Sequence, residues 1–191
     1  TQNKLSEAQK QEYLDVLIEK VDTATYASDI AKYIIALRAM GHDARKVVTS
    51  DFREIDVVKK LTDIVDAGGA PITGEWAYFS VPYIIIALQQ DAEYATKAQM
   101  DSLIAAALNS KSSWQSTEYG TDAATPMMLA LAPYRAGNAA VNAALNEAVA
   151  AVKTKQEETG TIGNACSTGL AMAAFAALGE NPASIKKAGS E

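Results

Sequence analysis

Aromatic side chains gather in two loops of this chain, where they could stack on a flat ligand. The candidate ligand-binding residues are Trp76, Tyr78, Phe79, Trp114, Tyr119 and the neighbouring Asp122. Such rings present a broad apolar face that suits a sugar, a peptide or a planar cofactor. The alternative is that they close one end of a helical fold and bind nothing, and the sequence leaves both interpretations open.

Three carboxylates accompany these rings, namely Glu75, Glu118 and Asp122. Paired carboxylates can act as acid and base on a glycosidic bond, so a glycan-active lyase or hydrolase is one alternative. Asp122 also suits the N-cap of a helix, where its side chain would accept from free backbone N–H groups. Acidic residues are ordinary in loops, and the structural role is the favoured interpretation.

The single histidine and the single cysteine do not form a metal or nucleophile site in the sequence. His42 is predicted to follow the end of a helix, where a cation would complement the helix dipole. Cys166 is predicted in the first turn of a helix, which can lower a thiol pKa, but no base lies near it in sequence. We therefore predict no catalytic residue and no metal ligand.

Charge and hydropathy exclude several classes of partner. The chain has 191 residues and a formal net charge of -6, without a run of Lys or Arg. Nucleic acid is therefore a poor partner. No apolar stretch reaches about 18 residues, so no transmembrane segment is predicted.

One unit is repeated four times: a polar loop, a small or acidic capping residue, and an apolar helix with few charges. The matching core positions lie 51, 43 and 44 residues apart, at Leu37, Leu88, Leu131 and Phe175. Periods of this length are typical of stacked helical hairpins. The predicted capping residues are Ser28 or Asp29, Ser80, Asp122, and Ser167 or Thr168.

Charged helices alternate with the apolar ones. Amphipathic helices with one apolar stripe are predicted over 6–21, 51–67, 96–108 and 138–155. The segments 80–90, 123–134 and 166–179 contain no Asp, Glu, Lys or Arg, which predicts inner helices buried on all sides. We therefore predict an all-α fold, an α/α toroid or an open arc of one, with inner and outer layers. A single domain, 1–191, would hold four hairpins over about 6–41, 51–91, 96–137 and 138–182.

Two of the repeats resemble a known family. The segments 122–134 (DAATPMMLALAPY) and 166–184 (CSTGLAMAAFAALGENPAS) are similar to the prenyltransferase and squalene-cyclase-like (terpenoid cyclase) repeat. There, a Gly and Trp loop leads to Asp-x-x-Thr and an Ala-Leu helix. The order of the units resembles the toroid domain of secreted surface proteins of Gram-positive bacteria, which is related to the α-domain of the cobalamin carriers transcobalamin and intrinsic factor. The resemblance covers about 23–184.

Departures from the family bear on activity. The Asp-x-Asp-Asp motif of cyclases, the Asp, Cys and His zinc ligands of protein prenyltransferases, and the Cys-x-x-Gln motif of thioester domains do not occur here. The resemblance thus implies a non-enzymatic extracellular binding or adhesion module, secreted or cell-wall associated and without a cofactor. Its partner would be a small molecule, a glycan or a cell-surface protein. The alternatives are a cobalamin or corrinoid carrier and the glycan-active enzyme.

Overall fold

The computed structural model describes residues 6–116 and 121–185, and within these ranges the chain is all-α apart from one short hairpin. The longer helices are α1 (Glu7–Thr23), α2 (Ala27–Ala39), α3 (Val57–Ala67), α5 (Ala77–Leu88), α6 (Lys97–Asn109), α8 (Thr121–Leu131), α9 (Ala139–Lys153) and α10 (Ala165–Ala177). The short elements are α4 (Ala70–Thr73), α7 (Lys111–Trp114), two 3-10 turns (Ala132–Tyr134 and Pro182–Ser184) and the strands β1 (Val47–Val48) and β2 (Glu54–Ile55). The prediction of an all-α fold is confirmed.

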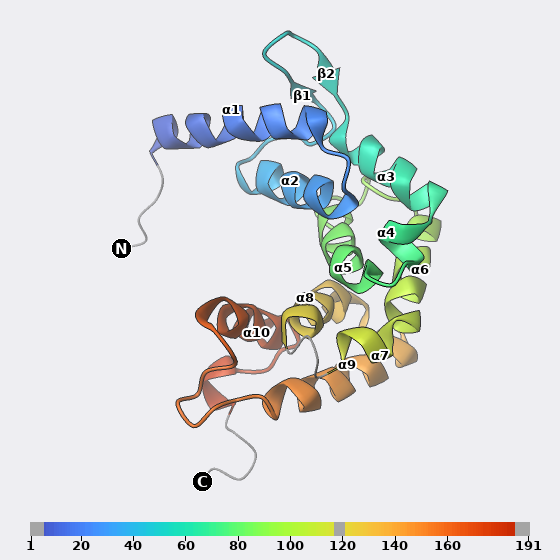
Figure 1. The fold of residues 1–191 in the computed structure, drawn as a ribbon, viewed down its shortest axis with the longest axis vertical. Helices are drawn as coiled ribbons and strands as arrows, with labels where there is room; N and C mark the ends of the chain where they lie inside the picture. Colours follow the sequence, from blue (N-terminus) through green and yellow to red (C-terminus); the bar gives the residue numbers. More distant parts are fainter. Residues whose placement is uncertain (1–5, 117–120, 186–191) are drawn as a thin grey trace.

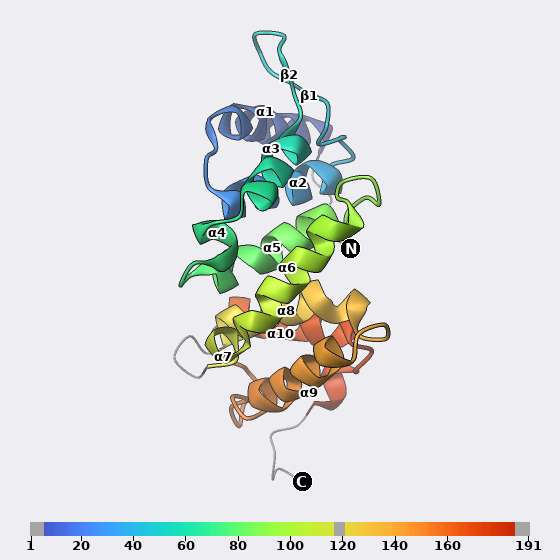
Figure 2. The same cartoon turned by 90° about the vertical axis from the view of Figure 1, so that its right-hand side faces the viewer.

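The helices form two curved layers. The inner row runs in chain order, with α2 packed on α5, α5 on α8, and α8 on α10. Figure 1 shows this row bending into an arc whose opening lies between α2 and α10. The outer helices α3, α6 and α9 run along the convex side, as Figure 2 shows in the turned view. The described residues form an open arc, and closure into a toroid stays a prediction.

In the middle of the arc the inner helices are buried on several sides, whereas the outer helices are buried along one stripe. In α8, Met127, Met128 and Leu131 are fully enclosed, because α5 and α10 pack on either side and α9 lies behind. In α3 the buried residues form one stripe (Val57, Val58, Leu61 and Val65), as an amphipathic outer helix requires. The core therefore lies between the two layers.

The predicted outer helix over 51–67 starts later than expected. Residues 47–55 form an antiparallel hairpin in which Val47 faces Ile55, and α3 begins only at Val57. The Asp56 side chain accepts from the backbone N of Lys59 at 2.7 Å and caps the helix. Phe52 at the hairpin tip is 90% exposed and has a φ of 64°. Val47 and Val48 are β-branched and suit a strand, and they lie before the predicted helix, whereas its expected first turn holds the partner strand Glu54–Ile55.

The predicted caps of α2, α5 and α10 are wrong, because these three helices begin up to one turn earlier. In α8, Asp122 lies within the first turn instead of before it. The N-cap positions of α2 and α5 are Tyr26 and Trp76, and neither side chain caps its helix. In α10 the cap is Asn164, whose Oδ1 accepts from the backbone N atoms of Cys166 and Ser167 at 2.8 and 3.0 Å.

The helix α10 differs from the fully buried helix expected over 166–179. It buries one face, with Ser167, Ala171, Ala174 and Phe175. Its other face is exposed and uncharged (Cys166, Gly169, Met172, Ala173, Ala176 and Ala177). The reason is position: within the described residues α10 is the last helix of the inner row, so α8 covers it from one side only. No helix in these ranges combines the length and apolar character needed to cross a membrane.

Candidate functional site

The first aromatic loop exposes one ring. Trp76 is 53% exposed and stacks on Phe79, with the ring planes 13° apart and the centroids at 6.3 Å. Tyr78 is 3% exposed and lies beneath this pair, with its centroid 6.0 Å from that of Trp76. Phe79 is half-buried. Trp76 is thus the ring of this loop that a ligand could reach most directly.

The second aromatic loop does not add a matching exposed ring. Trp114 is fully buried, and its Nε1 donates to the carbonyl of Ala107 at 2.7 Å. This bond joins α7 to the end of α6, so the indole fastens two outer elements together. Tyr119 and Glu118 lie outside the described residues. The structure therefore does not bring Trp76 and Trp114 together as one platform, because Trp114 serves the core.

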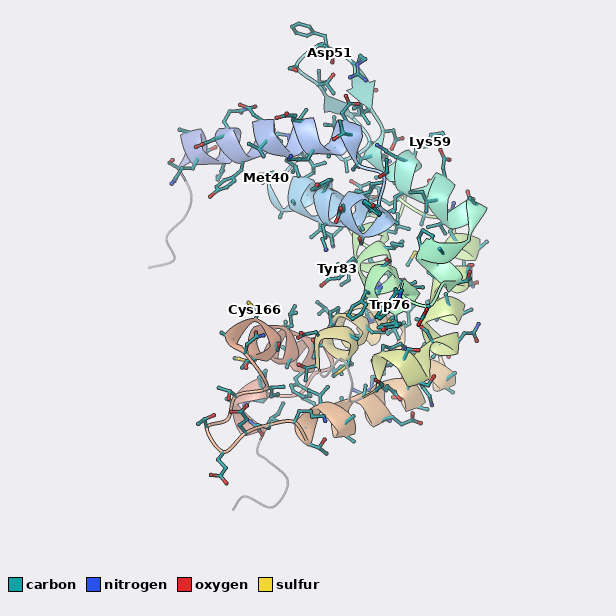
Figure 3. The ribbon with its side chains drawn as sticks, viewed as in Figure 1. Met40, Asp51, Lys59, Trp76, Tyr83 and Cys166 are labelled. Carbon is teal, nitrogen blue, oxygen red and sulfur yellow. The ribbon has the colours of Figure 1, made fainter. Side chains whose placement is uncertain are left out.

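A row of polar side chains crosses the inner layer instead, with one residue from each inner helix. We call Lys32, Tyr83, Asp122 and Ser167 the polar row. Lys32 on α2 places its Nζ 4.9 Å from the centroid of the Tyr83 ring on α5. Ser167 on α10 donates its hydroxyl to Oδ1 of Asp122 on α8 at 2.6 Å. Figure 3 shows Tyr83 pointing into the opening of the arc.

The electrostatics couple the two halves of the row. Burial raises the pKa of Tyr83 above its ordinary value of 10.0, and the negative charge of Asp122 raises it further. The phenol of Tyr83 therefore stays protonated at neutral pH and can donate a hydrogen bond.

Asp122 is held as an acceptor. Its side chain is exposed, whereas Ser167 beneath it is buried, so the hydroxyl fixes the carboxylate from the protein side. A carboxylate has about four lone-pair sites and so retains capacity after this bond. Pro126, four residues later within α8, has no N–H to offer the backbone carbonyl of Asp122. Asp122 thus concentrates acceptors, while Lys32 and Tyr83 supply donors.

An apolar surface continues from the polar row along the same helices. By helical spacing, Ala36 follows Lys32 on α2, Ile86 follows Tyr83 on α5, and Leu129 follows Asp122 on α8. On α10 the face that continues from Ser167 is buried, and the exposed Ala173 lies instead two turns after its neighbour Cys166. Figure 3 places Cys166 beside the opening. None of these side chains is fully buried. We call Ala36, Ile86, Leu129 and Ala173 the apolar floor.

Two cavities lie away from this surface. One of about 870 Å³ separates α1 from the β1–β2 hairpin and is lined mainly by polar residues, among them Asp15, Asp22 and Arg53. A second, of about 230 Å³, includes His42 in its lining. The described residues contain no cluster of His, Cys, Asp and Glu side chains that could hold a metal ion. Unlike these cavities, the polar row includes one residue from each of the four inner helices, and we take it as the candidate ligand-binding site.

The comparison with protein families decides the affiliation. Residues 2–190 match the family model described as eukaryotic cobalamin-binding protein. The chain belongs to this family. No curated protein and no solved structure matches the chain significantly.

This membership corrects one expectation and reorders the others. The prediction that the protein takes no cofactor is wrong, because the cobalamin-binding family points to cobalamin as the ligand. The carrier alternative has better support than an adhesion module. A small-molecule partner fits the family, whereas the prenyltransferase-like assignment and a bacterial surface protein stay predictions.

Three members of the polar row, Lys32, Tyr83 and Ser167, were not among the predicted ligand-binding residues: Tyr83 was noticed only as part of the aromatic group near Trp76, and Ser167 only as a cap. A signal for two of them was present. Lys32 and Tyr83 each stand five residues before the matching core leucines, Leu37 and Leu88, so they occupy equivalent places in consecutive repeats. Asp122 was singled out, but for the aromatic loop instead of the opening of the arc.

Proposed function

We propose that this protein binds cobalamin or a closely related corrinoid on the concave side of its inner helices and carries it without changing it chemically. The match of residues 2–190 to the cobalamin-binding family supports the ligand class. The polar row supports the location, because it joins donors and acceptors from four helices beside an uncharged floor.

The chemistry of a corrinoid fits these two surfaces. It is a wide macrocycle with apolar faces and primary amides around its edge. The apolar floor would lie against part of the macrocycle, and small side chains such as Ala36 and Ala173 permit close approach. Asp122 would accept from an amide N–H, and Tyr83 would donate to an amide carbonyl. Hydrogen bonds to charged groups contribute about 1.5–3 kcal/mol each, so the contact with Asp122 would be stronger than one between neutral groups.

The proposed carrier would have no enzymatic activity and would act outside the cell. The recognised motifs of the cyclase, prenyltransferase and thioester branches do not occur in the sequence, which supports binding without turnover. The resemblance to transcobalamin and intrinsic factor supports an extracellular carrier. Fractionating cells that express the full-length gene, and probing for this protein outside them, tests the location separately from binding.

The decisive experiment is titration with cobalamin, followed by the absorbance of the corrinoid and by calorimetry. We expect saturable one-to-one binding. Asp122→Ala should weaken it about 10- to 150-fold, as the loss of one charge-assisted hydrogen bond implies. Asp101→Ala on the outer helix α6 is the matched control, since Asp101 pairs with Lys97 at the surface and should leave affinity unchanged. Absence of cobalamin binding would refute the proposal, and equal affinity of the Asp122→Ala variant would move the site elsewhere.

A further inference from the structure

The inner helices carry very little positive charge. The helices α5, α8 and α10 contain no Lys or Arg, and α2 contains only Lys32 and Arg38. Arg38 is engaged at the other end of α2, where its Nη2 lies 3.7 Å from Asp91 and its guanidinium lies over the ring of Tyr94. Lys32 is therefore the inner-helix cation that belongs to the concave side.

Lys32 is held in position by a neighbouring ring, but no carboxylate forms an ion pair with it among the described residues. It is exposed. Its ammonium group reaches from α2 to the ring of Tyr83, a contact that steadies the side chain without occupying its N–H donors. Two carboxylates lie on the inner helices near it: Asp29, three residues earlier on α2, and Asp122 on α8, beyond α5. An anionic ligand group is thus tolerated at Lys32 and disfavoured next to these carboxylates.

We propose that Lys32 binds the phosphate of the nucleotide loop, so that the site selects phosphate-bearing corrinoids over truncated ones. This inference rests on the proposed corrinoid-binding function. The amides around a corrinoid are neutral, whereas the phosphodiester that links its lower base is the one anionic group on its periphery. A charge-assisted bond from an ammonium to a phosphate oxygen is of the strong kind. With Lys32 as the anchor for the phosphate and Asp122 as the acceptor for an amide, the ligand would be fixed in one orientation on the apolar floor.

Three corrinoids test this selection against the intact protein. Cobinamide has neither phosphate nor base, cobinamide phosphate has the phosphate alone, and cobalamin has both. We expect cobalamin and cobinamide phosphate to bind at least about tenfold more tightly than cobinamide, as one charge-assisted bond implies. Cobinamide phosphate should also lose affinity as its phosphate is protonated near pH 6. Raising the ionic strength should shrink the preference, because an exposed charge pair is screened by salt.

Variants assign the preference to Lys32. In Lys32→Met the three corrinoids should bind with nearly equal affinity, at the level of cobinamide. Lys32→Arg should keep the preference because it keeps the charge. Lys97→Met, the same change on the outer helix α6, should behave as the parent, since the Lys97 side chain is exposed and its helix does not belong to the inner row.

The outcomes separate this inference from the proposed function. If all three corrinoids bind the parent equally, the protein is a corrinoid binder but phosphate selection is wrong. If cobalamin alone binds tightly, the lower base carries the selectivity and the assignment to Lys32 is overturned. If Lys32→Met keeps the parent's preference, another group holds the phosphate. If no corrinoid binds at all, the proposed function fails first.

Discussion

The indole of Trp114 offers a sharp test of the distinction between core and ligand contact. Trp114→Phe removes a hydrogen bond to Ala107 and two ring carbons from a site with no exposed surface. A neutral hydrogen bond contributes about 1 kcal/mol and each buried carbon about 0.8 kcal/mol. The carbonyl of Ala107 keeps a second partner, the hydroxyl of Ser110 at 3.2 Å, so no further penalty for an unpaired acceptor applies. We expect the free energy of unfolding to fall by about 2–3 kcal/mol.

Urea unfolding measures this loss, and cobalamin titration measures its independence from binding. The midpoint should fall by about 1 M if the slope is about 2–3 kcal/mol/M, while the affinity for cobalamin stays at the parent's value. Trp76→Phe is the matched control: its ring is half exposed, and the change should cost less than about 1 kcal/mol. A Trp114→Phe variant that unfolds at the parent's midpoint yet binds cobalamin more weakly would refute the assignment of Trp114 to the core.

Two further predictions concern the elements at either end of the arc. Arg53→Met should raise the pKa of Asp22 toward its ordinary 3.8, measured by NMR titration of the carboxyl groups, because hydrogen bonding to Arg53 lowers it in the parent. Because the pKa of Asp22 is depressed in the folded state, the bond to Arg53 stabilises the protein above pH 3.8, and this stabilisation is lost as the pH falls through the folded-state pKa. If the pKa of Asp22 is the same in Arg53→Met as in the parent, the pair does not form. Asn164→Ala should lower the free energy of unfolding by about 1 kcal/mol through loss of the α10 cap, whereas Asn164→Asp keeps an acceptor and should not; equal losses in both would contradict the capping role.

The periodicity of the sequence was sufficient to predict the helical class and the alternation of helix types. The spacing of Leu37, Leu88, Leu131 and Phe175 depends on repeat length, which survives differences in local sequence, and all four residues are buried. Element boundaries were less predictable. Asn164 was overlooked as a cap because Ser167 and Thr168 also have capping side chains, and only the backbone geometry separates them.

Depth of burial could not be deduced from helix type. Leu103 lies on the amphipathic outer helix α6, and helix type alone would place it nearer to solvent than Leu131 on the inner helix α8. Both leucines are fully buried, because the apolar stripe of α6 packs against α5 of the inner layer. The sequence shows which residues are apolar, whereas the solvent exposure of each residue depends on how many helices pack around it.

The candidate site was missed for a related reason. A search for dense aromatic and acidic residues led to Trp76 and Trp114, which are close in sequence to other notable residues. The polar row is sparse within each repeat, with one residue per helix, and it becomes visible only when the four helices stand side by side. Ser167 carries no chemical signal of its own until its hydroxyl is seen to reach Asp122 across 45 positions of the chain.

An uncharged inner helix has two physical explanations, and hydropathy alone does not separate them. Such a face can be covered by another helix, as α8 is, or it can be kept free of charge so that an apolar ligand can lie on it. The exposed face of α10 and the apolar floor fit the second explanation: Ala173 is exposed, while Ile86 and Leu129 are only partly covered. A corrinoid on this floor would bury apolar surface, and each Å² buried contributes about 25 cal/mol of favourable free energy. Part of the binding energy would therefore come from side chains whose apolar character, in the sequence alone, predicts a protein core. The polar row would then fix the orientation of a ligand whose affinity rests largely on the floor.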